Sequence, residues 1–261
     1  MPRILTYNVR HCLGIDGQLS PERIAEVIAS CEPDVVALQE LDVNRARTGG
    51  IDQAQAIADG LGMHLHFYPA LREKEAFYGD AILTARPCTL VKAELLPTRG
   101  WRAFVEPRGA LWVSVNVDGA ELQVINTHLG LLEATRLQQI DVLLGPDWFA
   151  HPACREPVII AGDFNAIPRS GAYQRLAAHL RDAQTGLGTP RRQPTFPSRA
   201  PLLRLDHVFV SRSIEVLKAE AIRTPLARIA SDHLPLLVDF RIVTGEQRAK
   251  ESSDNSLAED R

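Results

Sequence analysis

Short apolar runs recur along the chain, and most of them end at a glycine, a proline or an aspartate. Short runs rich in valine and isoleucine are typical of β-strands, whereas helices show longer amphipathic periods. We therefore predict strands at residues 4–9, 33–39, 64–68, 80–84, 110–117, 122–127, 157–161, 205–211, 214–221 and 234–242. Several of these runs do not alternate between apolar and polar residues, which is typical of strands covered on both faces.

Amphipathic periods between some of these runs predict four helices. Ser20 is expected to cap the first helix, because a serine followed by proline and an acidic residue is typical of a helix start. Apolar residues then recur at helical spacing on one face: Ile24, Val27, Ile28 and Cys31. The other helices are predicted at residues 53–59, 133–144 and 171–181. Gly60 and Gly62 are expected to stop the second of the four.

Many strands with a few helices between them, in a chain of 261 residues, predict two packed β-sheets with helices on their outer faces. No internal repeat is visible in the sequence. We predict a single domain over residues 1–244. Residues 245–261 are predicted to form a disordered tail, because Leu257 is the one large aliphatic residue among them.

Composition narrows the classes of function. The formal net charge is −3 and 45% of the residues are hydrophobic, so we expect a globular chain without an overall basic field to gather nucleic acid. The sequence shows neither a secretory signal nor an apolar run long enough to cross a membrane, and it indicates no obligate protein partner. The four cysteines form no C-x-x-C pair and are expected to be reduced thiols in the cytoplasm.

Short polar clusters follow or end six of the apolar runs. A strand that ends in a carboxylate or an amide places that group at the rim of a sheet, where loops open a crevice. The clusters are Tyr7-Asn8, Gln39-Glu40, Asn126-Thr127-His128, Gly162-Asp163-Phe164-Asn165, Asp206-His207 and Ser231-Asp232-His233. Because all six contain Asn, Asp, Glu or His, they predict one site rather than separate turns.

The oxygen ligands in these clusters suit a hard cation such as Mg²⁺ or Mn²⁺ better than zinc. Glu40 is the leading ligand candidate, with Asn8 and Asp232 expected near it. One or two carboxylates are sufficient, because Mg²⁺ usually keeps several waters and binds substrate phosphate. The two Asp-His pairs also offer an imidazole that a carboxylate orients and stabilises in its charged form.

Each cluster has a simpler explanation when it is taken alone. An Asp-x-Asn segment after a strand, as in residues 162–165, is most often a turn in which side chains bond to the backbone. The cluster at residues 231–233 fits a turn that leads into a strand equally well. His207 is expected to be structural, and Asp80 is placed outside the predicted site as a turn residue. The prediction of a site therefore depends on the co-occurrence and order of the clusters.

With these clusters assembled, the chain resembles the endonuclease/exonuclease/phosphatase superfamily, whose members have the deoxyribonuclease-I-like fold. The resemblance runs from Thr6-Tyr7-Asn8 to Ser231-Asp232-His233-Leu234-Pro235, with each cluster in its expected order. It implies an α+β fold, a four-layer α/β/β/α sandwich of two packed mixed β-sheets with outer helices. It also implies a phosphoester hydrolase that depends on Mg²⁺ or Mn²⁺ and in which water attacks phosphorus. Short substrate loops favour a phosphodiesterase among the members of this class.

The resemblance implies roles for the matching residues. Glu40 would be the principal metal ligand, with Asn8 and Asp232 completing or approaching the metal site. Asp163 would orient or deprotonate the attacking water, and Asn165 would hydrogen-bond to a phosphate oxygen.

Three further positions complete this set. His233, oriented by Asp206, would act in proton transfer or bind the phosphoryl oxygen, and His128 would contact the phosphate or assist the leaving group. Arg108 is either a phosphate clamp or a surface arginine before a strand. Which group is the general base and which is the general acid stays open, because family members differ.

The substrate also stays open between a small phosphodiester, a lipid headgroup and a nucleic acid, and a phosphomonoesterase is an alternative to a diesterase. Loop arginines either bind such phosphates or are simply solvated: Arg45, Arg47, Arg99, Arg102, Arg191, Arg192, Arg199 and Arg204. Trp101 and Phe196 either contact the substrate or pack under their own loops. A non-catalytic binding module is the alternative from another class, and the loss of a cluster would indicate it.

Overall fold

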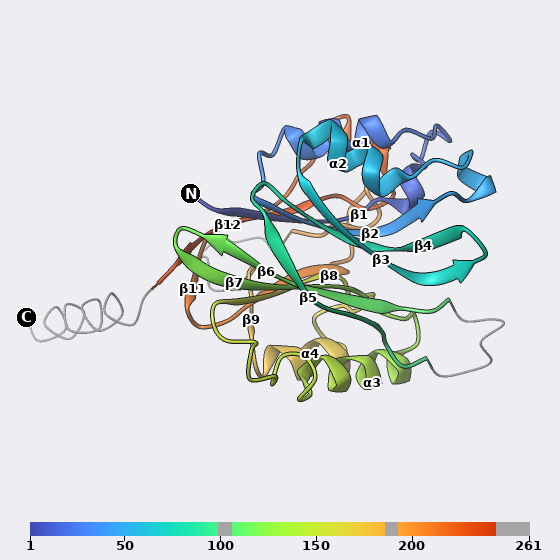
Figure 1. Ribbon diagram of the computed structural model, residues 1–261. Helices are drawn as coiled ribbons and strands as arrows, with labels where there is room; N and C mark the ends of the chain where they lie inside the picture. The colour runs from blue at the N-terminus through green and yellow to red at the C-terminus, as the bar shows by residue number, and fades with distance from the viewer. Residues whose placement is uncertain (99–105, 186–192, 244–261) are drawn as a thin grey trace, which may run out of the picture.

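The computed structural model describes residues 1–98, 106–185 and 193–243. Two β-sheets of six strands each pack face to face, with helices on their outer faces (Figure 1). The predicted α+β sandwich is therefore confirmed. The predictions for Arg99, Trp101, Arg102, Arg191, Arg192 and residues 245–261 lie outside the described residues.

The elements divide between the two sheets as follows. The first sheet contains, in spatial order, β11 (Ile214–Ala221), β12 (Leu236–Ile242), β1 (Arg3–Asn8), β2 (Val35–Val43), β4 (Ala76–Thr84) and β3 (His64–Glu73). The second contains β5 (Cys88–Leu95), β6 (Gly109–Val117), β7 (Ala120–His128), β8 (Val158–Asp163), β10 (Asp206–Val210) and β9 (Arg181–Asp182). The α-helices are α1 (Pro21–Ala29), α2 (Gln53–Leu61), α3 (Glu133–Leu144), α4 (Gly171–Ala177) and α5 (Ala227–Ala230). Among the described helices, none is long and apolar enough to cross a membrane.

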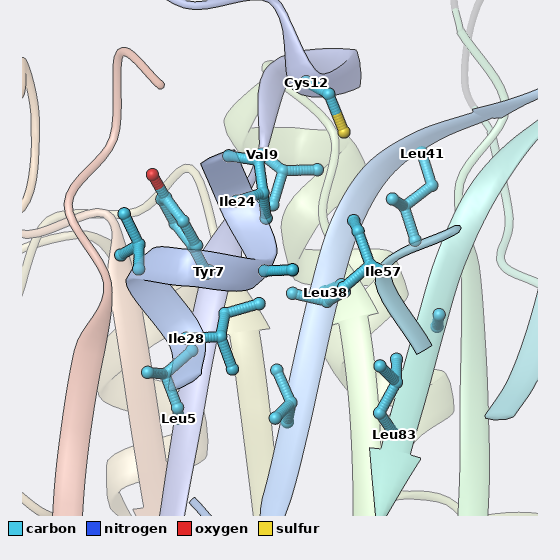
Figure 2. Packing of buried hydrophobic residues seen from close by; sticks show 14 of the residues in the cluster. Leu5, Tyr7, Val9, Cys12, Ile24, Ile28, Leu38, Leu41, Ile57 and Leu83 are labelled. Carbon is cyan, nitrogen blue, oxygen red and sulfur yellow. The ribbon is translucent and has the colours of Figure 1, made fainter. Parts of the chain in front are cut away.

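The inner strands are buried on both faces, as their non-alternating runs predict. Successive side chains of a strand point to opposite faces, so Ile4 of β1 packs between the sheets while Leu5 packs in the outer layer. Figure 2 shows this outer layer, in which Ile28 of α1 and Ile57 of α2 pack with Leu5. A third apolar cluster joins α3 and α4 to the second sheet. These three apolar clusters hold together the four layers of the sandwich, which are two sheets and a layer of helices on the outer face of each sheet.

Two helix ends differ from the prediction. Helix α2 continues through Gly60 to Leu61, and of the two glycines that were expected to stop it, Gly62 caps it with a left-handed φ of 64°. A Cβ at Gly60 would lie 3.3 Å from the Cβ of Ala25, so the glycine permits a close approach of α1 to α2. Helix α4 ends at Ala177 rather than at 181, because Arg181 belongs to β9 and pairs with Val210 of β10.

A buried ion-pair network joins α4, β9 and β10. The Asp182 Oδ2 atom accepts hydrogen bonds from Tyr173 Oη at 2.7 Å and from an Arg204 guanidinium nitrogen at 2.5 Å. The same oxygen lies 3.4 Å from His207 Nδ1, and His207 Nε2 lies 2.8 Å from the carbonyl oxygen of Ala166. His207 therefore connects this network to the loop that follows β8.

Asp182→Asn is expected to lower the free energy of unfolding by about 3–5 kcal/mol near neutral pH, because Arg204 would stay buried without its carboxylate. Burial alone would raise the pKa of Asp182, but the His207 hydrogen bond and the charges of His207 and Arg204 outweigh it and hold the pKa below its usual value. The ionised carboxylate thus stabilises the fold above the unfolded pKa of about 3.9, and this stabilisation is lost as pH falls towards the lower folded pKa.

Urea unfolding of wild type and Asp182→Asn, near pH 7 and near pH 3, checks this expectation. The difference in unfolding free energy should shrink at the lower pH. An equal difference at both values would show that the Asp182 charge does not stabilise the fold.

Candidate active site

The site forms at one edge of the sandwich, where strands from both sheets end. Strands β1 and β2 are parallel, as are β7 and β8, so the carboxyl ends within each pair lie together. Asn8 ends β1, His128 ends β7 and Asp163 ends β8. Asp206 begins the antiparallel strand β10, in register with Asp163. The topology therefore gathers residues that are far apart in the sequence.

A β-bulge aims Glu40 at this edge. In the pairing of β2 with β4, Gln39 and Glu40 together oppose Asp80 alone, and β2 continues to Val43 instead of ending at residue 39 as predicted. Glu40 has a φ of 64°, a left-handed conformation that is costly for a residue other than glycine. Bulges of this kind re-aim side chains next to active sites. Glu40 thereby lies with its Oε1 atom 4.0 Å from His128 Nε2.

The Asp163 carboxylate lies at the centre of the site. Its Oδ2 atom accepts a hydrogen bond from Asn8 Nδ2 at 2.9 Å, and it lies 3.5 Å from His128 Nε2 and 3.7 Å from His233 Nε2. The Oδ1 atom accepts a hydrogen bond from the Asn165 backbone N–H at 2.8 Å. Asn8 Nδ2 also donates to Glu40 Oε1 at 2.9 Å. One amide thus links the two carboxylates.

Asn165 and His128 lie together on the side of the second sheet. Asn165 Nδ2 donates to the carbonyl oxygen of Leu129 at 2.9 Å and lies 3.1 Å from His128 Nε2. Burial lowers the pKa of His128 well below its usual value, and the charges of Arg108 and His233 lower it further. His128 is therefore neutral near pH 7, so its approaches to Asp163 and Glu40 are not ion pairs, and its Nε2 accepts a hydrogen bond from Asn165 Nδ2.

His233 and Asp206 form a buried pair. His233 Nδ1 lies 2.9 Å from Asp206 Oδ2, and the same oxygen accepts a hydrogen bond from Thr195 Oγ1 at 2.5 Å. Burial alone would lower the pKa of His233, but the charges of Asp206 and Asp163 outweigh burial and raise it to about 10. Phe196 covers the imidazole, with ring centroids 4.8 Å apart. His233 is therefore held as an imidazolium between two carboxylates.

Among the residues that the structure describes, the site carries more negative charge than its cations balance. Burial raises the pKa values of Glu40 and Asp163, and it raises the pKa of Asp80 to about 8. The Arg108 guanidinium lowers the pKa values of Glu40 and Asp80, but it also lies 3.3 Å from the Glu106 carboxylate. Within the described residues, the buried acids around Glu40 thus lack full compensation.

This donor chemistry fits a hard divalent cation. Carboxylate oxygens are the preferred ligands of Mg²⁺ and Mn²⁺, and a bound cation would favour the ionised forms of Glu40 and Asp163. Asp163, Asp206 and His233 also each place one possible ligand atom within 4.8 Å of the others. Because His233 Nδ1 and Thr195 Oγ1 both bond to Asp206 Oδ2, we interpret that trio as a proton-handling group rather than a metal site.

The remaining predicted residues lie as follows. Asn8 presents its amide nitrogen to the two carboxylates, while its Oδ1 accepts from the Arg10 backbone N–H at 3.0 Å. The Asp232 carboxylate is about one-third exposed and lies 3.6 Å from Arg10 Nε, so among the described residues its ion pair is with Arg10. Arg108 is buried rather than a surface residue, and its Nε has no hydrogen-bond partner among the described residues.

Sequence reasoning left two residues that border the site, Asp80 and Thr195, outside it, and it did not foresee the contact that Phe196 makes. Asp80 was placed outside it, yet its Oδ1 faces the Glu40 backbone N–H at 3.4 Å. Thr195 was not considered. Phe196 was expected either to contact the substrate or to pack under its own loop, and its contact with His233 was not foreseen. A carboxylate within a predicted strand was an available signal for Asp80. No comparable signal marks Thr195, because its position depends on the loop before β10.

Comparison with known proteins finds a family model that matches most of this chain. The model of the Endonuclease/Exonuclease/phosphatase family matches residues 5–233. The chain is 32% identical over 179 residues to the protein YbhP of Escherichia coli strain K12, a match that covers 64% of this chain and 64% of that protein. The match thus spans less than two thirds of the length of this relative.

Solved structures share the fold. The mannosyl-6-phosphatase of Bacteroides thetaiotaomicron VPI-5482 is 20% identical with a TM-score of 0.76, and the alignment covers 93% of this chain and 100% of that chain. The human Nocturnin catalytic domain with a bound sulfate anion is 24% identical with a TM-score of 0.71, and the alignment covers 93% and 94%. Since the family model spans most of its length, the chain belongs to the endonuclease/exonuclease/phosphatase family.

Proposed function

We propose that the chain is a divalent-metal-dependent phosphodiesterase that cleaves a P–O bond by attack of water. The observation that carries the proposal is the Asp163 carboxylate, which is buried between Asn8, His128 and His233 with Glu40 beside it. A carboxylate among a neutral imidazole, an imidazolium and an amide can orient a water, accept its proton and transfer it onward. A binding module has no need for such an arrangement.

The cation that we propose is Mg²⁺ or Mn²⁺. Glu40 would be its principal ligand, and Asn8 and Asp232 would complete or approach the site, although Asp232 lies with Arg10 and Asn8 presents its nitrogen in the present arrangement. When bound, the cation supplies Lewis-acid stabilisation of the charge that develops on the phosphoryl oxygens. It would also balance the buried carboxylates of Glu40 and Asp163.

The side chains would orient the water, transfer protons and bind the phosphate oxygens. Asp163 orients or deprotonates the attacking water, and Asn165 donates a hydrogen bond to a phosphate oxygen. His233, held by Asp206, either transfers a proton or binds a phosphoryl oxygen. His128 is neutral and contacts the phosphate or the leaving group through hydrogen bonds. These donors stabilise a charge that is larger in the transition state than in the ground state.

Charge balance favours a diester over a monoester. A diester carries one negative charge and a monoester carries up to two, so a monoesterase needs more fixed cations. Arg108 and His233 are the cations we assign to the phosphate, and Arg108 is partly neutralised by Glu106. A phosphomonoester stays the alternative substrate, because the Bacteroides neighbour is named a mannosyl-6-phosphatase.

The free state of all four cysteines suits the cytoplasm as the compartment of the reaction.

Assays of the purified protein with Mg²⁺ or Mn²⁺ test this proposal. The substrates would be bis-p-nitrophenyl phosphate, p-nitrophenyl phosphate, plasmid DNA, RNA and a phospholipid panel. We expect the diester to be cleaved faster than the monoester, and the preferred natural substrate to separate a nuclease from a lipid or small-molecule diesterase. Faster cleavage of the monoester would instead assign the site to a phosphomonoesterase.

Arg108→Lys is expected to lower kcat/KM by roughly 10–100-fold, because a hydrogen bond to a charged group contributes about 1.5–3 kcal/mol and lysine cannot reproduce the guanidinium fork. The buried Nε of Arg108, which lacks a partner among the described residues, is the spare donor for a phosphate oxygen. Arg86→Lys, at an exposed turn, is the matched control and should behave like wild type. Equal kcat/KM in both variants would remove Arg108 from the phosphate site.

A further inference from the structure

One buried side chain connects the two sheets next to the catalytic edge. Asn126 of β7 is fully buried, two residues before His128. Its Nδ2 donates hydrogen bonds to the carbonyl oxygens of Leu38 and Ala81, each at 2.8 Å. Its Oδ1 accepts a hydrogen bond from Gln39 Nε2 at 2.8 Å. All three of these bonds cross from the second sheet to the first.

The bonds converge on the start of the bulge that carries Glu40. Leu38 and Ala81 form the last regular pair of β2 and β4 before the register shift, and Gln39 is the first of the two residues that oppose Asp80. A bulge locally disrupts the hydrogen-bond ladder, and the left-handed φ of Glu40 is a conformation that persists only where the surroundings enforce it. Donors from outside the strand pair are therefore the contacts that can hold this backbone in place.

We propose that Asn126 is a positioning residue that holds the Glu40 bulge, and with it the metal ligand, from the opposite sheet. The inference rests on the proposed function, because it gives Glu40 its role as ligand. Asn126 does not touch substrate or the reacting atoms. It acts through the backbone of β2 and β4, which determines where the Glu40 carboxylate lies.

The arrangement requires an amide at position 126. Two donors must face the carbonyls of Leu38 and Ala81 while one acceptor faces Gln39, and a planar amide of this length meets all three needs. Gln39 Nε2 also donates to Thr6 Oγ1 at 3.1 Å, which links the assembly to β1. An aspartate at position 126 would lack the donors, and a leucine would lack donors and acceptor alike.

The test compares Asn126→Leu with Gln123→Leu in the full-length chain. Gln123 lies on the same strand and is also buried, but it bonds to Trp112 Nε1 at 2.8 Å and Ser114 Oγ at 3.1 Å within the second sheet. Both variants therefore lose a buried amide, and both are expected to lower the melting temperature. Only Asn126→Leu removes bonds to the bulge.

Two measurements separate positioning from general stability. Amide hydrogen exchange of residues 39–42, in metal-free protein, should accelerate in Asn126→Leu and stay unchanged in Gln123→Leu. Mn²⁺ affinity, from the electron paramagnetic resonance signal of free Mn²⁺, should fall by roughly 10–100-fold in Asn126→Leu alone. If Asn126→Leu does not fold, Asn126→Ser and Gln123→Ser provide the same comparison with smaller cavities.

Equal exchange at the bulge in both variants, or unchanged Mn²⁺ affinity in the Asn126 variant, would overturn the inference. A wild-type protein that takes up no Mn²⁺ would contradict the proposed function instead. The exchange measurement needs no metal, so it would then decide by itself whether Asn126 holds the bulge.

Discussion

Glu40→Gln is expected to lower kcat/KM for metal-dependent hydrolysis by about 10³-fold or more. A catalytic metal contributes several kcal/mol to transition-state stabilisation, and each 1.4 kcal/mol corresponds to about tenfold in rate. Glutamine retains an oxygen that can accept from Asn8 Nδ2 but removes the charge of the proposed principal ligand. Steady-state kinetics on bis-p-nitrophenyl phosphate, at high Mg²⁺ or Mn²⁺, measures the loss.

The same variant should fold at least as stably as wild type without metal. Burial raises the pKa of Glu40 and the charge of Asp163 raises it further, so the ionised carboxylate destabilises the metal-free fold near neutral pH. The melting temperature in EDTA should therefore stay equal or rise, and added Mn²⁺ should raise the melting temperature of wild type alone. Glu121→Gln, at an exposed position of β7, is the matched control. Full activity in Glu40→Gln would remove Glu40 from the site.

His233→Ala is expected to lower kcat by roughly 10²–10⁴-fold, which is the usual contribution of a side chain that transfers a proton in the transition state. His64→Ala, at an exposed position of β3, should leave kcat unchanged. Asp206→Asn should also lower kcat, because Asp206 orients the imidazole and stabilises its charged form. The double variant should be little worse than His233→Ala alone, since the two residues act as a unit. Additive losses would contradict this pairing.

The pH dependence of Asp206→Asn tests the electrostatic part of the same prediction. The charges of Asp206 and Asp163 keep His233 protonated well above neutral pH, with a pKa of about 10. Removing the Asp206 charge lowers this pKa, so the variant loses the imidazolium at lower pH than wild type. If the protonated form is the active one, the alkaline limb of the kcat/KM profile should move to lower pH in Asp206→Asn. An alkaline limb at the same pH in both proteins would show that His233 does not titrate in it.

Much of the fold follows from patterns that are local in the sequence. The strand at Ile214–Ala221 and the helix at Glu133–Leu144 match their predicted bounds, and the helix ends where Gly145 and Pro146 follow it. Strand β5, an edge strand whose side chains are mostly exposed or half-buried, was not predicted. Its partner β6, which is largely buried, was predicted. Burial alone does not explain this difference, because the edge strand β11 is also mostly exposed or half-buried and was predicted.

The clusters at strand ends indicated which residues would meet, but not how. Asn8, Glu40, His128, Asp163 and His233 are joined by direct contacts, as one site at a shared edge requires, while their catalytic roles stay predictions. The contacts that shape the site come from register and from packing between the sheets.

Asp80 and Asn126 show why these contacts could not be predicted. Asp80 contacts the Glu40 backbone because β2 has one extra residue where it pairs with Asp80 of β4. No local pattern in the sequence indicates that bulge. Asn126 was part of a predicted cluster without a role of its own. Its importance depends on which carbonyls the opposite sheet presents, and this is a property of the folded chain alone.

The central claim is that this chain hydrolyses phosphoesters with a divalent metal at Glu40. The most direct measurement is hydrolysis of bis-p-nitrophenyl phosphate by protein that has been stripped with EDTA and then titrated with Mg²⁺ or Mn²⁺. We expect no turnover in the stripped protein and saturable recovery with either metal, but no recovery in Glu40→Gln. Turnover that persists in EDTA, or recovery that is equal in Glu40→Gln, would contradict the claim.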